Sequence, residues 1–199
     1  MKYGALLHPT WDTKLATQLV KIFELPLGRS YGKLSRGMKS LVGIVRGLAS
    51  RCPITMLDEP TLGLDADMRE LFYDLLLQDY TKYPRTFIIS THLIDEAFKL
   101  FETITYLDNG TIAAHMDSES FVQQAKLIQG DANLLRQWAQ DSHVIHQEGL
   151  GGTLAIIWLG DVPPTLIALQ GQGIQISGLS PQKLFQYLIQ MNNQNRGES

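Results

Sequence analysis

The sequence contains one cysteine, Cys52, among its 199 residues. One cysteine cannot close an internal disulfide, which indicates a reducing cytoplasm. No apolar run approaches the roughly 18 residues that a membrane-spanning helix needs. The apolar stretch within residues 1–9 is too short for a signal peptide and lacks a small-residue cleavage pattern. We therefore expect a cytoplasmic chain whose membrane association goes through a partner.

An excess of positive charge is also missing. The chain has 17 Lys and Arg against 20 Asp and Glu, which gives a net charge of −3. This balance argues against a dedicated nucleic-acid surface, and no nucleic-acid partner is expected. Hydrophobic residues make up 44% and charged residues 19%, as in globular proteins. The length suits one ordinary domain or two small ones.

Helices and short apolar runs alternate in the first half of the chain. Apolar residues at helical spacing predict one helix after Asp12 and another from about residue 36 to 49. The runs at 54–57 and 86–90 predict buried strands, and Asp67 with Glu70 resembles the capping box of a helix between them. Residues 95–101 are predicted helical, and residues 103–114 read as a hairpin. This alternation predicts an α/β fold with a largely parallel sheet.

The composition changes after about residue 116, where Gln, Gly and Asn become frequent. We predict a small α+β module over residues 117–191. Asp131 is expected to cap a helix, residues 154–159 to form a strand, and Ser180-Pro181 to begin a helix. Residues 192–199 are expected to be a disordered tail.

Two adjacent carboxylates, Asp58 and Glu59, follow the first apolar run. Side chains alternate along a strand, so the two should point in different directions. One could reach a magnesium ion through water, while the other orients or deprotonates a water for in-line attack on a γ-phosphate. The alternative is an ordinary solvated acidic loop.

Two further candidates concern phosphate. Ser35 lies where a helix should begin, and a helix N-terminus offers free N–H groups to an anion, which Gly37 would let approach closely. His92 follows the second apolar run, at a strand end where ligands bind in α/β sheets. Each has a plain alternative, namely a serine helix cap and a solvated histidine.

The order of these motifs resembles that of the ATP-binding cassette (ABC) ATPases. Residues 34–39 look like the signature motif, 54–59 like the Walker B strand, 62–65 like the D-loop, and His92 like the switch histidine. The resemblance covers about residues 6–114. It implies a partial P-loop NTPase sheet with a helical subdomain over residues 1–116, followed by the α+β module.

The resemblance also implies roles for particular residues. Of the catalytic residues, Glu59 would be the base and His92 would hydrogen-bond the γ-phosphate, while Asp58 would hold Mg²⁺. Ser35 and Gly37 would contact the γ-phosphate of ATP bound on a second ABC ATPase subunit in a head-to-tail dimer. Asp65, also at that nucleotide, would communicate across the dimer. The chain departs from the family pattern at Arg36, usually glycine, and Met38, usually glutamine. The Leu-Ser-x-Gly-Met version looks like the branch that powers exporters, and the segment 178–188 is similar to the end of that branch's accessory module.

The phosphate-binding loop Gly-x-x-x-x-Gly-Lys-Ser/Thr does not occur in the sequence. The adenine-stacking aromatic residue and the glutamine loop of the family are also absent. The resemblance therefore implies an N-terminally truncated subunit, with a Walker B strand that has an uncovered edge.

We expect the ATP-hydrolysing subunit of an ABC transporter, an exporter by its motifs, inactive alone and peripheral on the inner face of the cell membrane beside a separate permease chain. The alternative is a non-catalytic regulatory or dimerisation module. A soluble ABC ATPase acting on nucleic acid is disfavoured by the acidic charge balance.

Overall fold

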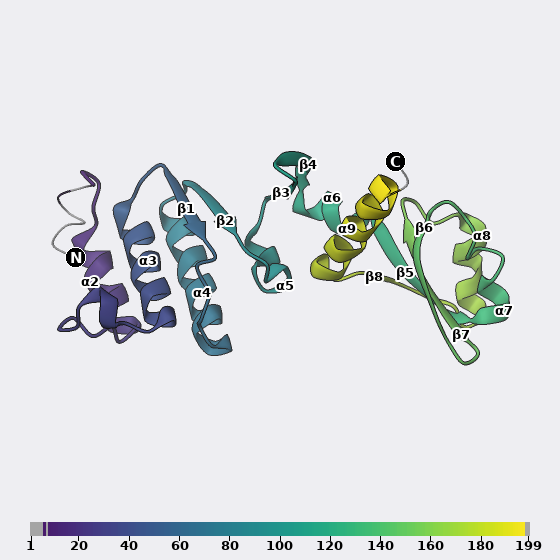
Figure 1. The fold of residues 1–199 in the computed structure, drawn as a ribbon, viewed down its shortest axis with the longest axis horizontal. Coiled ribbons are helices and arrows are strands. Elements are labelled where there is room, and N and C mark those ends of the chain that lie inside the picture. The colour runs from purple at the N-terminus through teal and green to yellow at the C-terminus, as the bar shows by residue number, and fades with distance from the viewer. Residues whose placement is uncertain (1–5, 7, 198–199) are drawn as a thin grey trace. The chain divides into compact units, whose positions relative to one another are not determined.

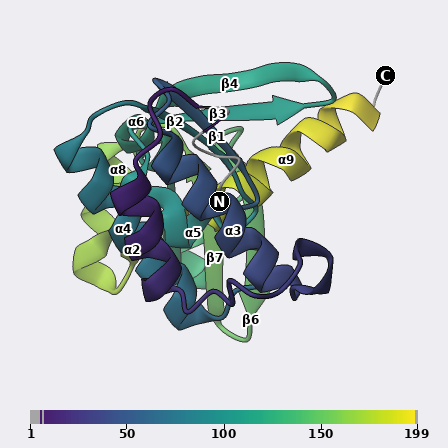
Figure 2. The ribbon, with the colours of Figure 1, turned by 90° about the vertical axis from the view of Figure 1, so that its left-hand side faces the viewer.

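A computed structural model describes residue 6 and residues 8–197, with side chains to residue 191. By its internal contacts the chain divides between Glu96 and Ala97 into two compact units, called unit 1 and unit 2 (Figure 1). Figure 2 turns unit 1 toward the viewer, with α2 and α3 in front. No helix among the described residues is both long and apolar enough to cross a membrane.

Unit 1 alternates helices with two short strands. Its elements are α2 (Thr13–Ile22), η1 (Tyr31–Lys33), α3 (Arg36–Ser50), β1 (Ile54–Asp58), α4 (Ala66–Lys82), β2 (Thr86–Ser90) and the start of α5 (Ile94–Ala97). Strands β1 and β2 pair in parallel, with α4 as the crossover between them. The helix–strand succession expected from the sequence is therefore confirmed.

Helix α3 forms the centre of unit 1 because its apolar residues recur on one face. Leu41, Ile44, Val45 and Leu48 are all at most 5% exposed. Gly47 lets the helix approach β1 closely, since a Cβ there would lie 2.9 Å from the Cδ2 atom of Leu57. This packing fixes the position of the strand that carries the two carboxylates.

The β1·β2 sheet leaves one apolar face uncovered. Ile54, Met56 and Ile88 are 59%, 74% and 48% exposed, whereas Thr55 and Leu57 on the other face of β1 are buried. Within the described part of the chain, β1 pairs with β2 alone. Apolar side chains this exposed on neighbouring strands form an apolar surface that packed sheets normally cover.

The start of α4 differs from the expected capping box. The N-cap is Asp65, whose Oδ1 accepts a hydrogen bond from the backbone N–H of Met68 at 2.9 Å. The N-cap thus lies two residues before Asp67, and the helix begins at Ala66. The pattern of an acidic residue before a helix fits both positions, and the turn after β1 decides between them.

Unit 2 is built mainly from antiparallel strands. Its elements are η2 (Phe98–Leu100), β3 (Thr103–Asp108), β4 (Thr111–Asp117), α6 (Ser118–Gln123), β5 (Ala125–Asp131), α7 (Ala132–Leu135), β6 (Val144–Leu150), β7 (Thr153–Leu159), α8 (Pro164–Ile167), η3 (Ala168–Gln172), β8 (Gln175–Gly178) and α9 (Pro181–Gly197). The β3–β4 hairpin is confirmed, and a four-stranded sheet has the order β6-β7-β5-β8. Of these four strands, the sequence predicted β7 but not β5, β6 or β8.

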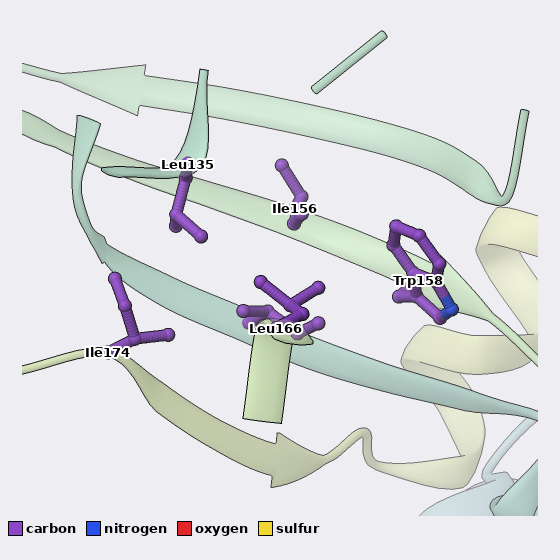
Figure 3. Close-up of a cluster of buried hydrophobic side chains, with 6 residues drawn as sticks. Leu135, Ile156, Trp158, Leu166 and Ile174 are labelled. Atoms are coloured by element: carbon purple, nitrogen blue, oxygen red, sulfur yellow. The ribbon is translucent and has the colours of Figure 1, made fainter. Parts of the chain in front are cut away.

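One face of the four-stranded sheet covers a closed apolar core. Leu135, Ile156 and Leu166 are 0% exposed, and Trp158 and Ile174 are 2% exposed (Figure 3). The Trp158 indole N–H donates to the carbonyl oxygen of Asp161 at 3.0 Å, so its polar atom is satisfied. Strands and helices after residue 116 thus enclose a core of their own, and the accessory α+β module over residues 117–191 stays a prediction.

Two boundaries differ from the sequence expectation. The compact units meet at residue 96, whereas the family resemblance placed the domain boundary at 116. The difference arises because β3 and β4 pair with each other and not with β1 or β2; the domain boundary at 116 stays a prediction. At the other end, residues 192–197 continue α9 where a disordered tail was expected, and residues 198–199 lie outside the described range.

Candidate functional site

The two carboxylates lie at the carboxyl end of the parallel sheet. Asp58 is the last residue of β1, and its register partner on β2 is Ser90. The Ser90 hydroxyl donates a short hydrogen bond to Oδ1 of Asp58. Because the register places Ser90 directly opposite Asp58, the pairing of the two strands holds the Asp58 carboxylate in place.

Glu59 turns away from the strand. Its φ of 42° lies in the left-handed region, which costs a residue other than glycine about 1–3 kcal/mol. The backbone N–H of Glu59 donates to the carbonyl oxygen of Ser90 at 3.0 Å, and its own carbonyl oxygen accepts from the N–H of Leu62 at 3.1 Å. Such strain is typical of functional sites, where the surrounding bonds hold it.

His92 meets the Glu59 carboxylate. Its Nδ1 atom lies 2.9 Å from both Oε1 and Oε2. The histidine side chain is 63% exposed and that of the glutamate 31%. With a proton on Nδ1, His92 donates to the carboxylate and fixes its orientation. The expectation that Asp58 and Glu59 point in different directions is thereby met, since one contacts Ser90 and the other His92.

The start of α3 packs against the turn that follows β1. A Cβ on Gly37 would overlap the carbonyl oxygen of Gly63 and lie 3.2 Å from its carbonyl carbon. Gly63 itself has φ 81°, a conformation that glycine adopts without strain. The Ser40 hydroxyl donates to the carbonyl oxygen of Leu62 at 2.7 Å. Gly37 is thus required by a backbone contact within the chain.

Ser35 and Asp65 both cap helices. Ser35 Oγ accepts from the N–H of Met38 at 3.2 Å, as in the plain alternative considered above. Both side chains are exposed, and a hydroxyl that accepts one bond keeps its proton and a second lone pair. Capping by Ser35 leaves a further contact available, and the Asp65 carboxylate accepts its capping bond through Oδ1.

Burial shapes the electrostatics behind the site. Tyr73 on α4 is 2% exposed, and desolvation by burial raises the pKa of its phenol. It therefore stays neutral at physiological pH and adds no charge there.

Two residues that contribute to the site, Ser90 and Ser40, were not predicted from the sequence. Ser90 stands two residues before His92, and only the strand register reveals its role.

The donor set suits a partly hydrated magnesium ion. No group of three His, Cys, Asp or Glu side chains in the described part of the chain is arranged to hold a metal. Asp58 supplies hard carboxylate oxygens, and Mg²⁺ commonly takes one or two carboxylates with waters and substrate phosphates. The residues present therefore fit Mg²⁺ only together with a phosphate group.

A family model described as "AAA domain, putative AbiEii toxin, Type IV TA system" matches residues 24–95. The ABC transporter ATP-binding protein YtrB of Bacillus subtilis is 26% identical over 155 residues, which cover 75% of this chain and 52% of YtrB. The high-affinity zinc uptake system ATP-binding protein ZnuC of B. subtilis is 32% identical over 99 residues, covering 50% of this chain and 42% of ZnuC. This chain is a homologue of ABC transporter ATP-binding proteins.

The fold agrees with this homology. This chain is similar to the solved structure of an ATP binding subunit of an ABC transporter, with a TM-score of 0.50 and 25% identity. The similarity covers 56% of this chain and 47% of the solved one. The α/β fold of an ABC ATPase cassette is therefore confirmed. This chain spans about half the length of YtrB and of ZnuC.

Proposed function

We propose that this chain is the part of an ABC transporter ATP-binding subunit that positions the attacking water and contacts the γ-phosphate of ATP. The observation that carries the proposal is the pairing of Glu59 with His92 at the ends of two parallel strands. A carboxylate oriented by a histidine can accept a proton from water. The strained backbone at Glu59 supports a functional role for this turn.

The other site residues take complementary roles in this proposal. Asp58 would hold Mg²⁺, which supplies neutralisation of phosphate charge when it is bound. The exposed Ser35 hydroxyl and the N-terminus of α3 would contact ATP held by a second subunit, with Gly37 keeping the helix on the turn that leads to Asp65. The partners are thus a second ATP-binding subunit and a permease chain, which would place the protein at the inner face of the cell membrane.

We further propose that these residues do not suffice for ATP turnover. The sequence has no Gly-x-x-x-x-Gly-Lys-Ser/Thr loop to grip the β- and γ-phosphates. In the described part of the chain β1, which delivers Asp58, pairs with β2 alone, and one apolar face of this two-stranded sheet is exposed. Purified protein should show no turnover with magnesium and ATP. Turnover that Glu59→Gln abolishes and the exposed control Glu119→Gln preserves would overturn this part of the proposal.

The role in a pair is tested with an intact homologous subunit. Co-purified with such a subunit, the chain should support ATP hydrolysis that depends on Ser35. Asp and Asn both cap helices well, so Ser35→Asp and Ser35→Asn differ mainly in charge. We expect Ser35→Asp to lower the rate further, because its carboxylate repels the phosphate. Equal rates for the two variants would contradict a phosphate contact.

Export is the direction we propose, on the basis of the Leu34–Met38 motif and the segment 178–188. Among its relatives is ZnuC, named for zinc uptake, so similarity alone does not set the direction. ATP-driven flux in inverted membrane vesicles that contain the complete transporter measures it: accumulation inside them indicates export.

A non-catalytic regulatory or dimerisation module is the second candidate. The missing phosphate-binding loop favours it. In that case the chain would change the ATPase rate of an intact subunit, and Glu59→Gln would leave that change intact.

A further inference from the structure

Unit 1 contains a groove of about 540 Å³ that none of the site residues lines. Residues of α2 line one side, residues of α4 and Tyr83 line the other, and Leu48 and Arg51 at the end of α3 contribute to the lining. Leu15 and Leu75 are half-buried and contribute apolar surface, while Leu19 and Leu48 are buried beneath it. The groove is thus an open, partly apolar depression between helices of a single compact unit.

The carboxylates inside the groove are neutralised by arginines. Arg51 contacts Asp12 at 3.2 Å and Asp79 at 2.5 Å, and Asp79 also pairs with Arg85 at 2.8 Å. The Arg51 guanidinium lies 3.9 Å from the centre of the Tyr83 ring. These contacts leave no uncompensated negative charge from Asp12 or Asp79 for a ligand to meet.

The rim of the groove carries uncompensated positive charge. Lys14 and Lys21 belong to α2, Lys82 to α4, and all three are exposed. None of these lysines forms an ion pair with another residue in the described part of the chain. The chain as a whole has a net charge of −3, so this local excess of lysine is opposite in sign to the protein.

Two apolar groups are presented at the groove surface. Ile22 is 43% exposed and Tyr83 is 54% exposed. Tyrosine and arginine are the residue types that most often dominate protein–protein binding energy, and here Tyr83 is stacked on Arg51. A partly apolar groove between helices with charged margins matches the way amphipathic helices bind in grooves.

We propose that this groove binds an acidic amphipathic helix of a partner protein. The apolar face of that helix packs on Leu15, Leu75, Ile22 and Tyr83. Its Asp and Glu side chains lie beside the three lysines of the rim. Charge complementarity selects the partner, because a basic or neutral helix gains nothing from the three lysines. The groove residues are separate from the Asp58–Glu59 site, and this binding does not require nucleotide.

The experiment uses the full chain and a synthetic probe. A fluorescein-labelled 18-residue peptide carries leucine at helical positions i, i+3, i+4 and i+7 and glutamate at the flanking positions. A matched peptide carries lysine in place of each glutamate. By fluorescence anisotropy at low salt we expect the acidic peptide to bind at least about tenfold more tightly than the lysine peptide, with affinity that falls as salt is added.

Charge-reversal variants test whether the acidic peptide binds in the groove. Lys14→Glu, Lys21→Glu and Lys82→Glu together should weaken the acidic peptide at least about tenfold. The control reverses three other exposed lysines, Lys33, Lys99 and Lys183, with the same change in net charge. Ile22→Gln should also weaken binding, which tests the apolar part of the contact. All these side chains are exposed, so circular dichroism should show an unchanged fold.

Other outcomes would overturn the proposal. Equal affinity for the two peptides, or equal weakening by the two triple variants, would show that the groove does not select acidic helices. Self-association in sedimentation velocity that is lost with the groove triple variant would assign the groove to a second copy of this chain. A protein that binds anionic phosphatidylglycerol vesicles but has the same affinity for both peptides would show that the lysines face a lipid surface.

Discussion

Gly37 lies in the first turn of α3, where its backbone touches Gly63 in the turn after β1. Gly37→Ala adds a single methyl group that overlaps the carbonyl oxygen of Gly63 and also lies 3.4 Å from the Cδ2 atom of Leu64. The obstacle is backbone rather than a flexible side-chain end. The turn or the helix must therefore shift to make room.

The magnitude follows from packing. Forcing one methyl group into a close-packed position costs about 1–3 kcal/mol. Gly43 on the same helix gives the matched control, because a Cβ there meets nothing within 4 Å. Gly43→Ala should instead stabilise the helix by about 0.5–1 kcal/mol. The two variants make the same chemical change and are expected to differ in sign.

Hydrogen exchange read by mass spectrometry on peptides covering α3 measures the free energy of opening in unit 1 separately from unit 2. Gly37→Ala should lower protection across the start of α3 and the turn at residues 61–65, while Gly43→Ala raises it in α3. Equal protection in the two variants would show that the Gly37–Gly63 contact does not hold the start of α3 against the turn at residues 61–65. If Gly37→Ala lowers protection in α3 but leaves protection of the turn at residues 61–65 unchanged, the two segments are not coupled.

Three further changes test the packing and charge described above. Asp79→Asn removes the buried carboxylate between two arginines and should lower stability by about 3–5 kcal/mol in urea titrations, whereas the exposed Asp74→Asn on the same helix should change little. The backbone N–H of Leu15, together with Arg51, lowers the pKa of Asp12. The stability from this shift is fully present above about pH 4 and is lost as the pH falls through the lowered pKa. Asp12→Asn keeps the helix cap, so it should flatten the acid side of the stability–pH profile. Leu166→Ala empties part of the core in Figure 3 and should cost about 2–5 kcal/mol, read by Trp158 fluorescence, while Ile167→Ala beside it should cost less than about 1 kcal/mol.

Each of these has a result that would contradict it. Equal effects of Asp79→Asn and Asp74→Asn would show that burial does not decide the cost. A parallel pH profile for Asp12→Asn would show that the hydrogen bond and ion pair at Asp12 do not couple to folding. Similar losses at positions 166 and 167 would place Leu166 outside the core.

Much of the site could be predicted from the sequence because its parts are local. Ser35 stands at a helix start, and Asp58 follows an apolar strand, so propensity and periodicity locate both. Ser90 was missed, since its role exists only through the register that sets it opposite Asp58. The left-handed backbone of Glu59 was also missed, because no glycine marks the position.

The sequence by itself determined the helices and strands of unit 1, the order of its motifs and the resemblance to ABC ATPases. It did so because helical and strand periodicities are set by neighbours a few residues apart. The tertiary structure decided which face of β1·β2 is left exposed, that His92 reaches both oxygens of Glu59, and that a lysine-rimmed groove forms from α2, α3 and α4. These features depend on contacts between residues distant in sequence, which only the packed chain brings together.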